Sequence, residues 1–507
     1  MSQLSLWDFA SSRRSSVRAL SKSRVMAGLQ CRKRLYLEAY HHNERDPVEP
    51  GRLAILEAGR QVGEVARGRY PGGITVTEDP QLHDQAQRET AAALAPSGPP
   101  AIYEAAFTHA QIRARVDILA RKGGNAWDLI EVKSSSGFKE EYLHDIAIQL
   151  HVAESSGVPI DRAMLLHVNN QYVWPGGDYD LAALFTELDL TSEARASIPG
   201  LLECVEAMRA TLQATEIPDI AVGPHCRKPY VCSFYNYCHQ ETPEHHVTDL
   251  PRLSPKVYWA LLGADILDIR DIPDEFPGLS ELQWRVRNCV VTGDQFAHPE
   301  LKSALAAVRY PVHFLDFETC NPAIPIIPGT RPFQQTPFQW SDHVLDESGA
   351  VHERSYLHAD RTDPIRRLTE ELIDALDGEG SIVVYSEFEG RVIRGLAEAL
   401  PSLAGRLLPL VEHRMVDLHR LIHSHYYHPE FHGSFSIKDI LPVLVAGLDY
   451  SDLEIREGSQ AAVAFARMTD PKAPAAERNK LRDGLLAYCR RDTEAMLRLY
   501  QTLKEIS

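Results

Sequence analysis

The sequence predicts an α/β protein made of two compact domains and a helical connector between them. Its 507 residues exceed the roughly 100–200 that one domain usually holds. Strand and helix patterns alternate over residues 1–245 and again over residues 306–507, whereas residues 246–305 have the pattern of helices with short loops. Hydrophobic residues make up 44% of the chain and charged residues 24%, the balance of a folded globular protein rather than a disordered one.

In the first domain the patterns predict two helices, a strand pair, a third helix, a further strand and more helices. Ser21 is positioned to cap the first helix, because serine accepts hydrogen bonds from the free N–H groups there. The expected ranges are 21–45 and 52–69 for the first two helices, 111–120 and 127–133 for the strand pair, 139–155 for the third helix, 163–168 for the further strand and 180–216 for the last helices.

The charge balance limits the possible partners. The chain has 53 Lys and Arg against 70 Asp and Glu, a net charge of −17, which excludes a protein that coats nucleic acid by bulk positive charge. A basic stretch without any acid could form a phosphate-contacting arm or a solvated tail; it contains Arg13, Arg14, Arg18, Lys22, Arg24, Arg32, Lys33 and Arg34.

The sequence shows no membrane or secretion signal. No stretch approaches the ~20 apolar residues of a membrane helix, and the N-terminus lacks the apolar core of a secretory signal. We therefore expect a soluble, cytoplasmic protein without membrane association. The sequence identifies no protein partner.

The strand pair carries the first group of functional residues. Side chains alternate along a strand, so Glu131 and Lys133 project side by side, and Asp117 on the partner strand lies roughly opposite. Two carboxylates can hold Mg²⁺ or Mn²⁺, and a lysine can orient water or meet a developing oxyanion. A surface hairpin with a cross-strand ion pair is the structural alternative.

This D…E-x-K arrangement resembles the PD-(D/E)XK nuclease fold, which has a mixed-sheet core. Gln149 on the following helix matches the glutamine of the RecB-type subgroup, although the tyrosine usual four residues later is Ala153 here. The resemblance implies a further metal ligand on the second helix, which we assign to Glu64, with Glu57 as its rival.

Three of the eight cysteines form a C-x5-C-x5-C segment, Cys226, Cys232 and Cys238. Structural zinc sites usually use pairs two to four residues apart, so the wide spacing suits an iron–sulfur cluster with four cysteine ligands. The fourth ligand must come from elsewhere, and Cys31 stands far upstream. Zinc and free thiols are the alternatives. We expect the remaining cysteines to be ordinary buried thiols; these are Cys204, Cys289, Cys320 and Cys489.

The cysteine order resembles the iron–sulfur subgroup of RecB-type nucleases. In that subgroup one cysteine precedes the catalytic core and three follow it, so that a cluster joins the ends of the domain. The resemblance implies that Cys31, Cys226, Cys232 and Cys238 bind a 4Fe–4S cluster.

The second domain carries another set of acids. Asp316 and Glu318 lie two apart at the end of a strand, and Glu389 follows a second strand, 381–387. Tyr488 and Asp492 lie four apart, and therefore on one face, in the C-terminal helix expected over 479–504. A hairpin is expected between Glu318 and Glu389, with its turn at 346–349.

This order of residues resembles the DEDDy subgroup of DnaQ-like exonucleases, on an RNase H-like fold. The resemblance implies that Asp316, Glu318, Glu389 and Asp492 bind two metal ions and that Tyr488 orients the attacking water. The second motif normally has Asp where this chain has Glu389, and the neighbouring Glu387 is a rival ligand.

Segments 331–340 and 428–444 also resemble a bacterial family of unknown function that joins a RecB-like half to an exonuclease-like half. Six histidines crowd the same region: His413, His419, His423, His425, His428 and His432. Among them, His419 and His423 can share a helix face and could bind metal; contact with substrate or simple exposure to solvent is the favoured alternative.

Together these features predict two nuclease-type domains, 1–245 and 306–507, joined by the connector 246–305. The expected activity is metal-dependent hydrolysis of phosphodiester bonds in single-stranded DNA or at DNA ends, with DNA favoured over RNA. The resemblance implies 3′–5′ exonuclease activity in the second domain. A nucleic-acid-binding scaffold with one or both sites silent is the alternative, and a zinc-bearing structural protein is a third.

Overall fold

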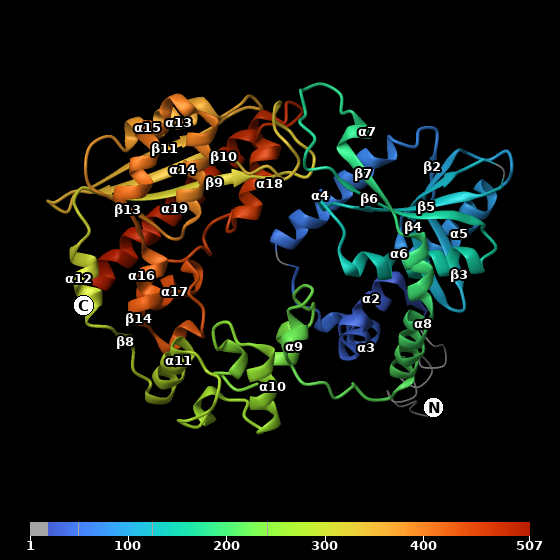
Figure 1. Cartoon of the computed structure of the whole chain (residues 1–507), viewed down its shortest axis with the longest axis horizontal. Coiled ribbons are helices and arrows are strands. Elements are labelled where there is room, and N and C mark those ends of the chain that lie inside the picture. Colours follow the sequence, from blue (N-terminus) through green and yellow to red (C-terminus); the bar gives the residue numbers. More distant parts are fainter. Residues whose placement is uncertain (1–18, 49, 124, 241, 507) are drawn as a thin grey trace, which may run out of the picture. The chain divides into compact units, whose positions relative to one another are not determined.

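A computed structural model describes residues 19–48, 50–123, 125–240 and 242–506. The protein is α/β, and its chain divides into two compact units between residues 241 and 242 (Figure 1). Residues 174–176 belong to the second unit, and residues 331–333 belong to the first. Arg13, Arg14 and Arg18 of the basic stretch lie outside the described residues. No helix in the described ranges has the length and apolar character needed to cross a membrane.

A seven-stranded mixed sheet organises the first unit. Its order is β2-β3-β4-β5-β6-β7, with β1 paired to β4. The elements are β1 Leu20–Ser21, α2 Lys22–Gln30, α3 Arg32–Tyr40, α4 Pro50–Arg67, β2 Ile74–Thr75, α5 His83–Ala93, β3 Ala101–His109, β4 Ile112–Arg121, β5 Trp127–Lys133, α6 Glu140–Ser155, β6 Ile160–Val168, α7 Leu181–Leu184, β7 Phe185–Asp189, α8 Thr191–Gln213 and α9 Tyr235–His239.

The predicted strand pair, third helix and further strand correspond to β4, β5, α6 and β6. Ser21 caps α2, its Oγ accepting from the N–H of Arg24. The first helix differs from the prediction, because Cys31 has an extended backbone and separates α2 from α3. The expectation that helices alone occupy 180–216 is wrong at one place. Residues 185–189 extend the sheet instead, by pairing antiparallel with β6.

The second unit contains a five-stranded sheet in the order β11-β10-β9-β12-β13 and a two-stranded sheet of β8 and β14. Its elements are α10 Pro255–Gly263, α11 Glu281–Thr292, β8 Phe296–Ala297, α12 Glu300–Ala306, β9 Val312–Cys320, β10 Thr336–Leu345, β11 Val351–Leu357, α13 Ile365–Ala375, β12 Ser381–Val384, α14 Phe388–Ala399, α15 Ala404–Pro409, β13 Met415–Asp417, α16 Leu418–His425, β14 Tyr426–Tyr427, α17 Ile437–Leu444, α18 Gly458–Met468 and α19 Ala475–Ile506.

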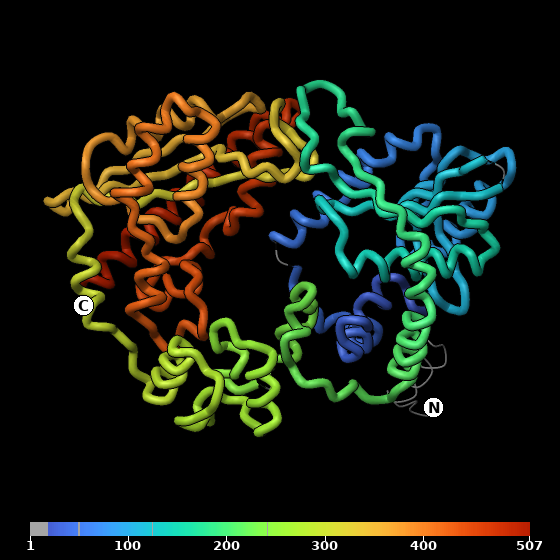
Figure 2. The backbone as a smooth tube through the Cα atoms, viewed as in Figure 1, coloured from blue at the N-terminus to red at the C-terminus, as the bar shows by residue number. Residues whose placement is uncertain are grey.

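Strands β9, β10 and β11 are antiparallel neighbours, and β12 and β13 run parallel to β9. Helices α13, α14 and α15 cover one face of this sheet, and α18 and α19 cover the other (Figures 1 and 2). Side chains of β9 alternate between these layers: Phe314 packs with the α18–α19 side, and Leu315 and Phe317 pack with the α13–α15 side.

Residues 246–305, expected as a connector, are largely helical but are not a separate spacer. Their buried side chains, among them Tyr258 and Leu261, belong to the same hydrophobic core as Phe314 and Phe465. Burial of these apolar side chains therefore makes the segment part of the second unit.

Gly380, immediately before β12, has a sharp steric requirement. Its φ is +102°, and an added Cβ would lie 2.1 Å from the carbonyl oxygen of Pro311. Gly378 has a similar φ of +95° but open space around it. We expect Gly378→Ala to lower the free energy of unfolding by about 1 kcal/mol, the penalty for positive φ alone. Gly380→Ala should cost about 3 kcal/mol or more, because the backbone must also shift.

Urea unfolding of the two variants, followed in the second unit, measures this difference. Equal losses of stability in Gly378→Ala and Gly380→Ala would contradict the close approach of the backbone at Pro311.

Candidate functional site

An acidic cluster forms at the carboxyl ends of β9 and β12 in the second unit. Asp316 and Glu318 lie on the face of β9 that carries Phe314, whose ring packs against Tyr500 of α19. Strand β12 runs parallel to β9, so both end at the same edge of the sheet, and α14 begins there with Glu389 in its first turn. This edge is where open α/β sheets usually bind ligands.

The long helix α19 brings Cys489 and Asp492 to the cluster. Cys489 Sγ lies 3.6 Å from Asp316 Oδ2, and single donor atoms of Asp316, Glu318 and Cys489 lie within 4.8 Å of one another. Tyr450 donates a hydrogen bond of 2.5 Å to Asp492 Oδ1. The four acids expected from the sequence thus meet at one place, although they come from three distant parts of the chain.

Buried polar contacts fix the position of α19 on the sheet. The hydroxyl of Thr493 lies 3.1 Å from Ser341 Oγ and 2.7 Å from His343 Nδ1, both on β10. The side chain of Gln339, also on β10, donates to the carbonyl of Leu485 at 2.9 Å. Because hydrogen bonds depend on direction and distance, these contacts set the rotation of the helix and thereby aim its acidic face at β9.

None of the four carboxylates has an ion-pair partner among the residues that the structure describes. Glu318 and Glu389 are buried, and Asp316 and Asp492 are partly buried. Burial, together with the neighbouring carboxylates, raises the pKa of Asp316 and Glu318 well above the usual range. Burial also raises the pKa of Glu389 to about 7 and that of Asp492 to about 6. The cluster therefore retains protons near neutral pH.

The donor set fits Mg²⁺ or Mn²⁺, which prefer oxygen ligands. Glu389 Oε2 is buried and has no hydrogen-bond partner in the described structure. Buried carboxylate oxygens normally have such a partner. Burial raises the pKa of Cys489 well above its usual range, so its thiol stays protonated and is a poor ligand for a hard cation. Glu387 is exposed, whereas Glu389 faces the cluster.

Two tyrosines and a lysine line the same place. The rings of Tyr450 and Tyr488 lie 6.2 Å apart, and Lys438 Nζ lies 5.4 Å and 5.5 Å from their centroids. Burial, and then the charge of Asp492, raises the pKa of both tyrosines far above the usual range, so both hydroxyls keep their protons. The sequence analysis did not find Tyr450, Lys438 or the placement of Cys489, because only tertiary contacts bring them here.

A cavity of about 510 Å³ opens beside the end of β12. Tyr385, His419, His423 and Phe435 line it, and Arg252 adds a positive charge. The two histidines lie on one face of α16, with ring centroids 5.9 Å apart. Aromatic rings beside a cation suit a stacked base and its phosphate.

The first unit brings Asp117 and Glu131 together. Asp117 Oδ2 accepts a hydrogen bond of 2.8 Å from the backbone N–H of Val132, the residue after Glu131. Lys133 lies beside them on β5, its Nζ 2.7 Å from Glu131 Oε1 and 2.5 Å from Asp145 Oδ2. The predicted D…E-x-K residues are therefore neighbours in space.

Unlike the acids of the second unit, Glu131 is extensively paired. Lys22 Nζ lies 3.0 Å and 3.2 Å from its two oxygens, and Gln149 Nε2 donates to Oε2 at 2.6 Å. Burial opposes ionisation of Glu131, but Lys22 and Lys133 outweigh it and hold its pKa at about 2. Burial and the charge of Glu131 raise the pKa of Asp117 to about 7. The sequence analysis placed Lys22 in a phosphate-contacting arm or a tail, because nothing local links it to a residue 109 positions away.

A cavity of about 470 Å³ opens at this site. Glu64 lines it together with Asp117 and Glu131, whereas its rival Glu57 does not. Glu104 also lines the cavity and has a φ of +60°, which is rare for a residue in a strand. Such strain commonly marks functional positions, and it makes Glu104 a further candidate ligand.

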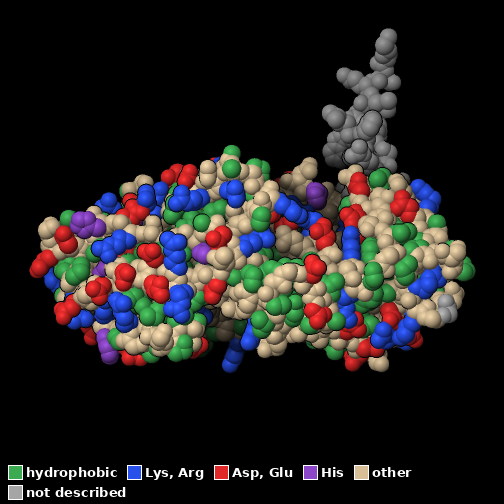
Figure 3. Space-filling model, turned by 90° about the horizontal axis from the view of Figure 1, so that it is seen from above, with side chains coloured by type: hydrophobic (Ala, Val, Ile, Leu, Met, Phe, Trp, Pro, Cys, Tyr) green, Lys and Arg blue, Asp and Glu red, His purple; other side chains and the backbone are tan. Residues whose placement is uncertain are grey.

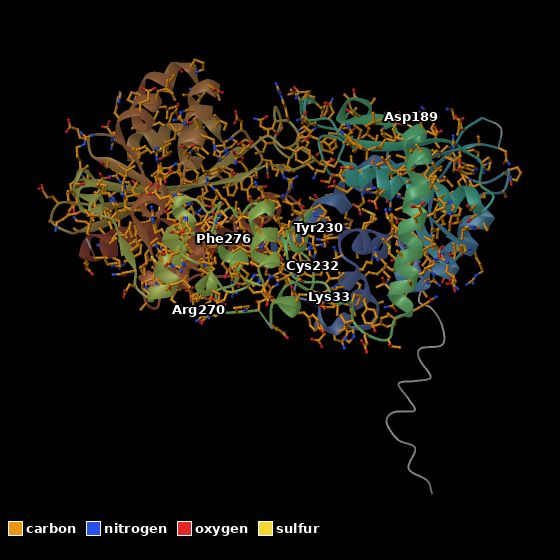
Figure 4. The ribbon with its side chains drawn as sticks, turned by 60° about the horizontal axis from the view of Figure 1, so that its bottom comes forward. Lys33, Asp189, Tyr230, Cys232, Arg270 and Phe276 are labelled. Atoms are coloured by element: carbon orange, nitrogen blue, oxygen red, sulfur yellow. The ribbon has the colours of Figure 1, made fainter. Side chains whose placement is uncertain are left out.

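The four predicted cysteines line one cavity in the first unit: Cys31, Cys226, Cys232 and Cys238. Lys33 lines the same cavity (Figure 4). The side-chain amide of Gln30 lies 2.9–3.0 Å from three carbonyl oxygens of the loop 225–230, so it joins the helix before Cys31 to the cysteine segment. Residues nearly 200 positions apart therefore meet as the cysteine order predicts.

The four thiols form a donor set of a kind that both zinc ions and iron–sulfur clusters use. A tetrahedral zinc site with Zn–S bonds of about 2.3 Å places its sulfurs about 3.8 Å apart. Among the described residues, the sets of three donor atoms within 4.8 Å do not include these thiols, although the four influence one another electrostatically. Burial raises the pKa of Cys238 to about 11, and the charge of Lys33 opposes this shift.

Comparison with known proteins adds one similarity. A family model described as a domain of unknown function, DUF2779, matches residues 313–436. The matched range contains Asp316, Glu318 and Glu389 but ends before Tyr488 and Asp492. No curated protein matches the chain.

The protonated acids predict a specific pH dependence. The pKa of Asp492 is about 6 when folded, above the value of about 3.9 in an unfolded chain, so the folded state holds more protons between these values. The free energy of unfolding of metal-free protein should therefore fall as pH rises through this window. Asn stays neutral, so Asp492→Asn should raise the free energy of unfolding by roughly 1–3 kcal/mol at pH 8 and by much less at pH 4.5.

Denaturant unfolding with a chelator present, at the two pH values, measures this effect. Asp452→Asn is the matched control, because a hydrogen bond from Arg491 lowers the pKa of the exposed Asp452 carboxylate. Asp452→Asn should leave the free energy of unfolding at pH 8 unchanged or lower it slightly. A loss of stability in Asp492→Asn at pH 8 would contradict the repulsion within the cluster.

Proposed function

We propose that the protein is a metal-dependent nuclease with a 3′–5′ exonuclease site in its second unit. One observation carries the proposal: four acids that form no ion pair among the described residues converge at the carboxyl ends of β9 and β12. Catalytic sites for phosphodiester hydrolysis use such acids to hold divalent metal ions.

Three features support a DEDDy-type site on an RNase H-like fold. The sheet combines three antiparallel strands with two that run parallel to β9. The acids occur in the order Asp316, Glu318, Glu389 and Asp492. Tyr488 lies one helical turn before Asp492, and its hydroxyl is protonated and so able to donate to the attacking water.

Each residue would have a distinct role. Asp316, Glu318, Glu389 and Asp492 would hold Mg²⁺ or Mn²⁺, and Tyr488 would orient water. A divalent cation bound there neutralises phosphate charge and lowers the pKa of a coordinated water.

We propose a second, PD-(D/E)XK-type nuclease site in the first unit. Asp117, Glu131 and Glu64 would be its metal ligands, Lys133 would orient water or meet the oxyanion, and Gln149 holds Glu131 in place through its hydrogen bond of 2.6 Å. The cysteines would bind a 4Fe–4S cluster that joins the segment around Cys31 to residues 226–238.

Single-stranded DNA or DNA ends are the proposed substrates, with DNA favoured over RNA. Acidic and basic side chains are interspersed on the face seen in Figure 3, so binding would depend on local features rather than on bulk charge. The cavity lined by Tyr385, His419, His423 and Phe435 supports binding of an unpaired strand by stacking.

A nucleic-acid-binding role for the first unit, with its catalytic site silent, is a second candidate. The favouring observation is that Lys22 already occupies both oxygens of Glu131. Metal binding by Glu131 would therefore require Lys22 to move, whereas no described cation has to leave the second-unit acids.

Variants should separate the two proposed sites. Tyr488→Phe removes one hydroxyl, so folding should survive while release from 3′-labelled single-stranded DNA falls by about 10- to 1,000-fold, the loss typical of one positioned catalytic group. Asp316→Asn should abolish the same activity and weaken Mn²⁺ binding. Lys133→Ala should leave 3′ trimming intact and remove any remaining cleavage.

The measurement uses 5′- and 3′-labelled DNA and RNA strands with Mn²⁺, and with chelator as the blank. Tyr356→Phe, a tyrosine outside the acidic cluster, is the matched control. Wild-type 3′ trimming by both Asp316→Asn and Tyr488→Phe would reject the exonuclease site and leave the second unit as a binding module.

The cysteine set predicts a brown protein after anaerobic purification. Cys232→Ser should remove the colour and the iron and destabilise the first unit, because binding energy at such a site is also folding energy. Cys204→Ser is the matched control. Cys204 was expected to be buried, but it lies on the exposed face of α8 and outside the cysteine cavity. Stoichiometric zinc with no iron in the wild-type protein would refute the cluster.

A further inference from the structure

A second set of possible metal ligands lies in the second unit and uses no residue of the acidic cluster. His298 and Glu300 lie at the start of α12, and His425 ends α16. Single donor atoms of the three lie within 4.8 Å of one another, and the two imidazole centroids are 5.6 Å apart. Two imidazoles and one carboxylate are a ligand set that proteins use for zinc and related metals.

The fold brings these residues together through a small sheet. Strand β8 pairs antiparallel with β14, and the backbone N–H of His298 donates to the carbonyl of His425 at 2.7 Å. Residues far apart in the sequence are thus fixed side by side by main-chain hydrogen bonds. The position of both imidazoles therefore depends on regular structure rather than on a loose surface contact.

One detail favours a bound cation. His425 Nδ1 is buried and has no hydrogen-bond partner in the described structure, a condition that usually indicates a missing water or ion. His298 Nδ1 accepts a hydrogen bond of 3.2 Å from the N–H of Glu300 and lies 3.9 Å from Glu300 Oε2, so a metal ion bound at this nitrogen replaces that hydrogen bond.

We infer that His298, Glu300 and His425 bind a divalent transition-metal cation of the zinc class. Tetrahedral zinc with bonds of about 2.1 Å requires donors about 3.4 Å apart, and the donor atoms here lie within 4.8 Å of one another. The Glu300 side chain is 71% exposed and can rotate to close the gap. Imidazole nitrogens distinguish this site from the all-oxygen acidic cluster, which suits harder cations. The bound ion joins the start of α12 to the end of α16.

The chain contains a natural control for this site. His428-Pro429-Glu430 repeats the tripeptide His298-Pro299-Glu300 and follows β14 as the latter follows β8. In both copies the His Nδ1 accepts from the Glu N–H at 3.2 Å. Within the described structure, however, no third donor completes a set at the second copy. The two copies therefore share sequence and turn geometry and differ in the third ligand.

Zinc content of the full-length protein tests the inference. Wild type, His298→Gln and His428→Gln are stripped with chelator, equilibrated with buffered Zn²⁺ and analysed for zinc per chain. Any zinc bound by the cysteines or by the acidic cluster should be the same in all three proteins. His298→Gln should hold one zinc fewer per chain than wild type, and His428→Gln should match wild type.

A second variant keeps both histidines. Glu300→Gln should weaken zinc binding at this site at least ten-fold, and zinc should raise the Tm of wild type by more than that of either His298→Gln or Glu300→Gln. Equal zinc content in wild type and His298→Gln, or an equal loss in His428→Gln, would overturn the assignment.

Discussion

Repulsion among four carboxylates that form no ion pair in the described structure is the constraint on which the second unit depends. Two unit charges at the 4.8 Å that bounds the Asp316, Glu318 and Cys489 donor set repel by roughly 3 kcal/mol at an effective dielectric constant of 20. Burial adds to this penalty by removing water from the charged forms. The arrangement persists because the sheet, the Thr493 contacts and the packing of α19 hold the acids in place whatever their charge. This repulsion lowers the stability of the folded state, and a divalent cation bound by the carboxylates would reduce it.

In the first unit, buried carboxylate charge is compensated in a different way. Glu131 is neutralised within the protein by Lys22 and Lys133, and Gln149 satisfies one of its oxygens. Burial and the charge of Glu131 raise the pKa of Asp117 to about 7, and burial raises that of Glu104. The two sites therefore differ in how far their acids are neutralised by the protein itself. This difference in pairing makes the second-unit site the stronger candidate for catalysis.

Local patterns predicted much of this structure, and long-range contacts account for what they missed. Alternation along residues 111–133 was enough to place Asp117 beside Glu131, because a tight hairpin fixes which residues face each other. Helical spacing was enough to put Tyr488 and Asp492 on one face of α19. The break at Cys31 and the strand at 185–189 went unseen, because their conformation is set by partners elsewhere in the chain. Lys22 and Tyr450 were missed for the same reason.

Sequence separation also explains why the cysteines could be grouped but the histidines could not. The C-x5-C-x5-C spacing is local, so the sequence alone indicates a shared ligand. His298 and His425 carry no such signal, since each is an ordinary histidine until β8 pairs with β14. The repeated His-Pro-Glu shows the point directly: two identical tripeptides adopt the same turn, and only the one that lies beside His425 acquires a third donor among the described residues. The chemistry of a surface tripeptide is thus determined by what the fold places next to it.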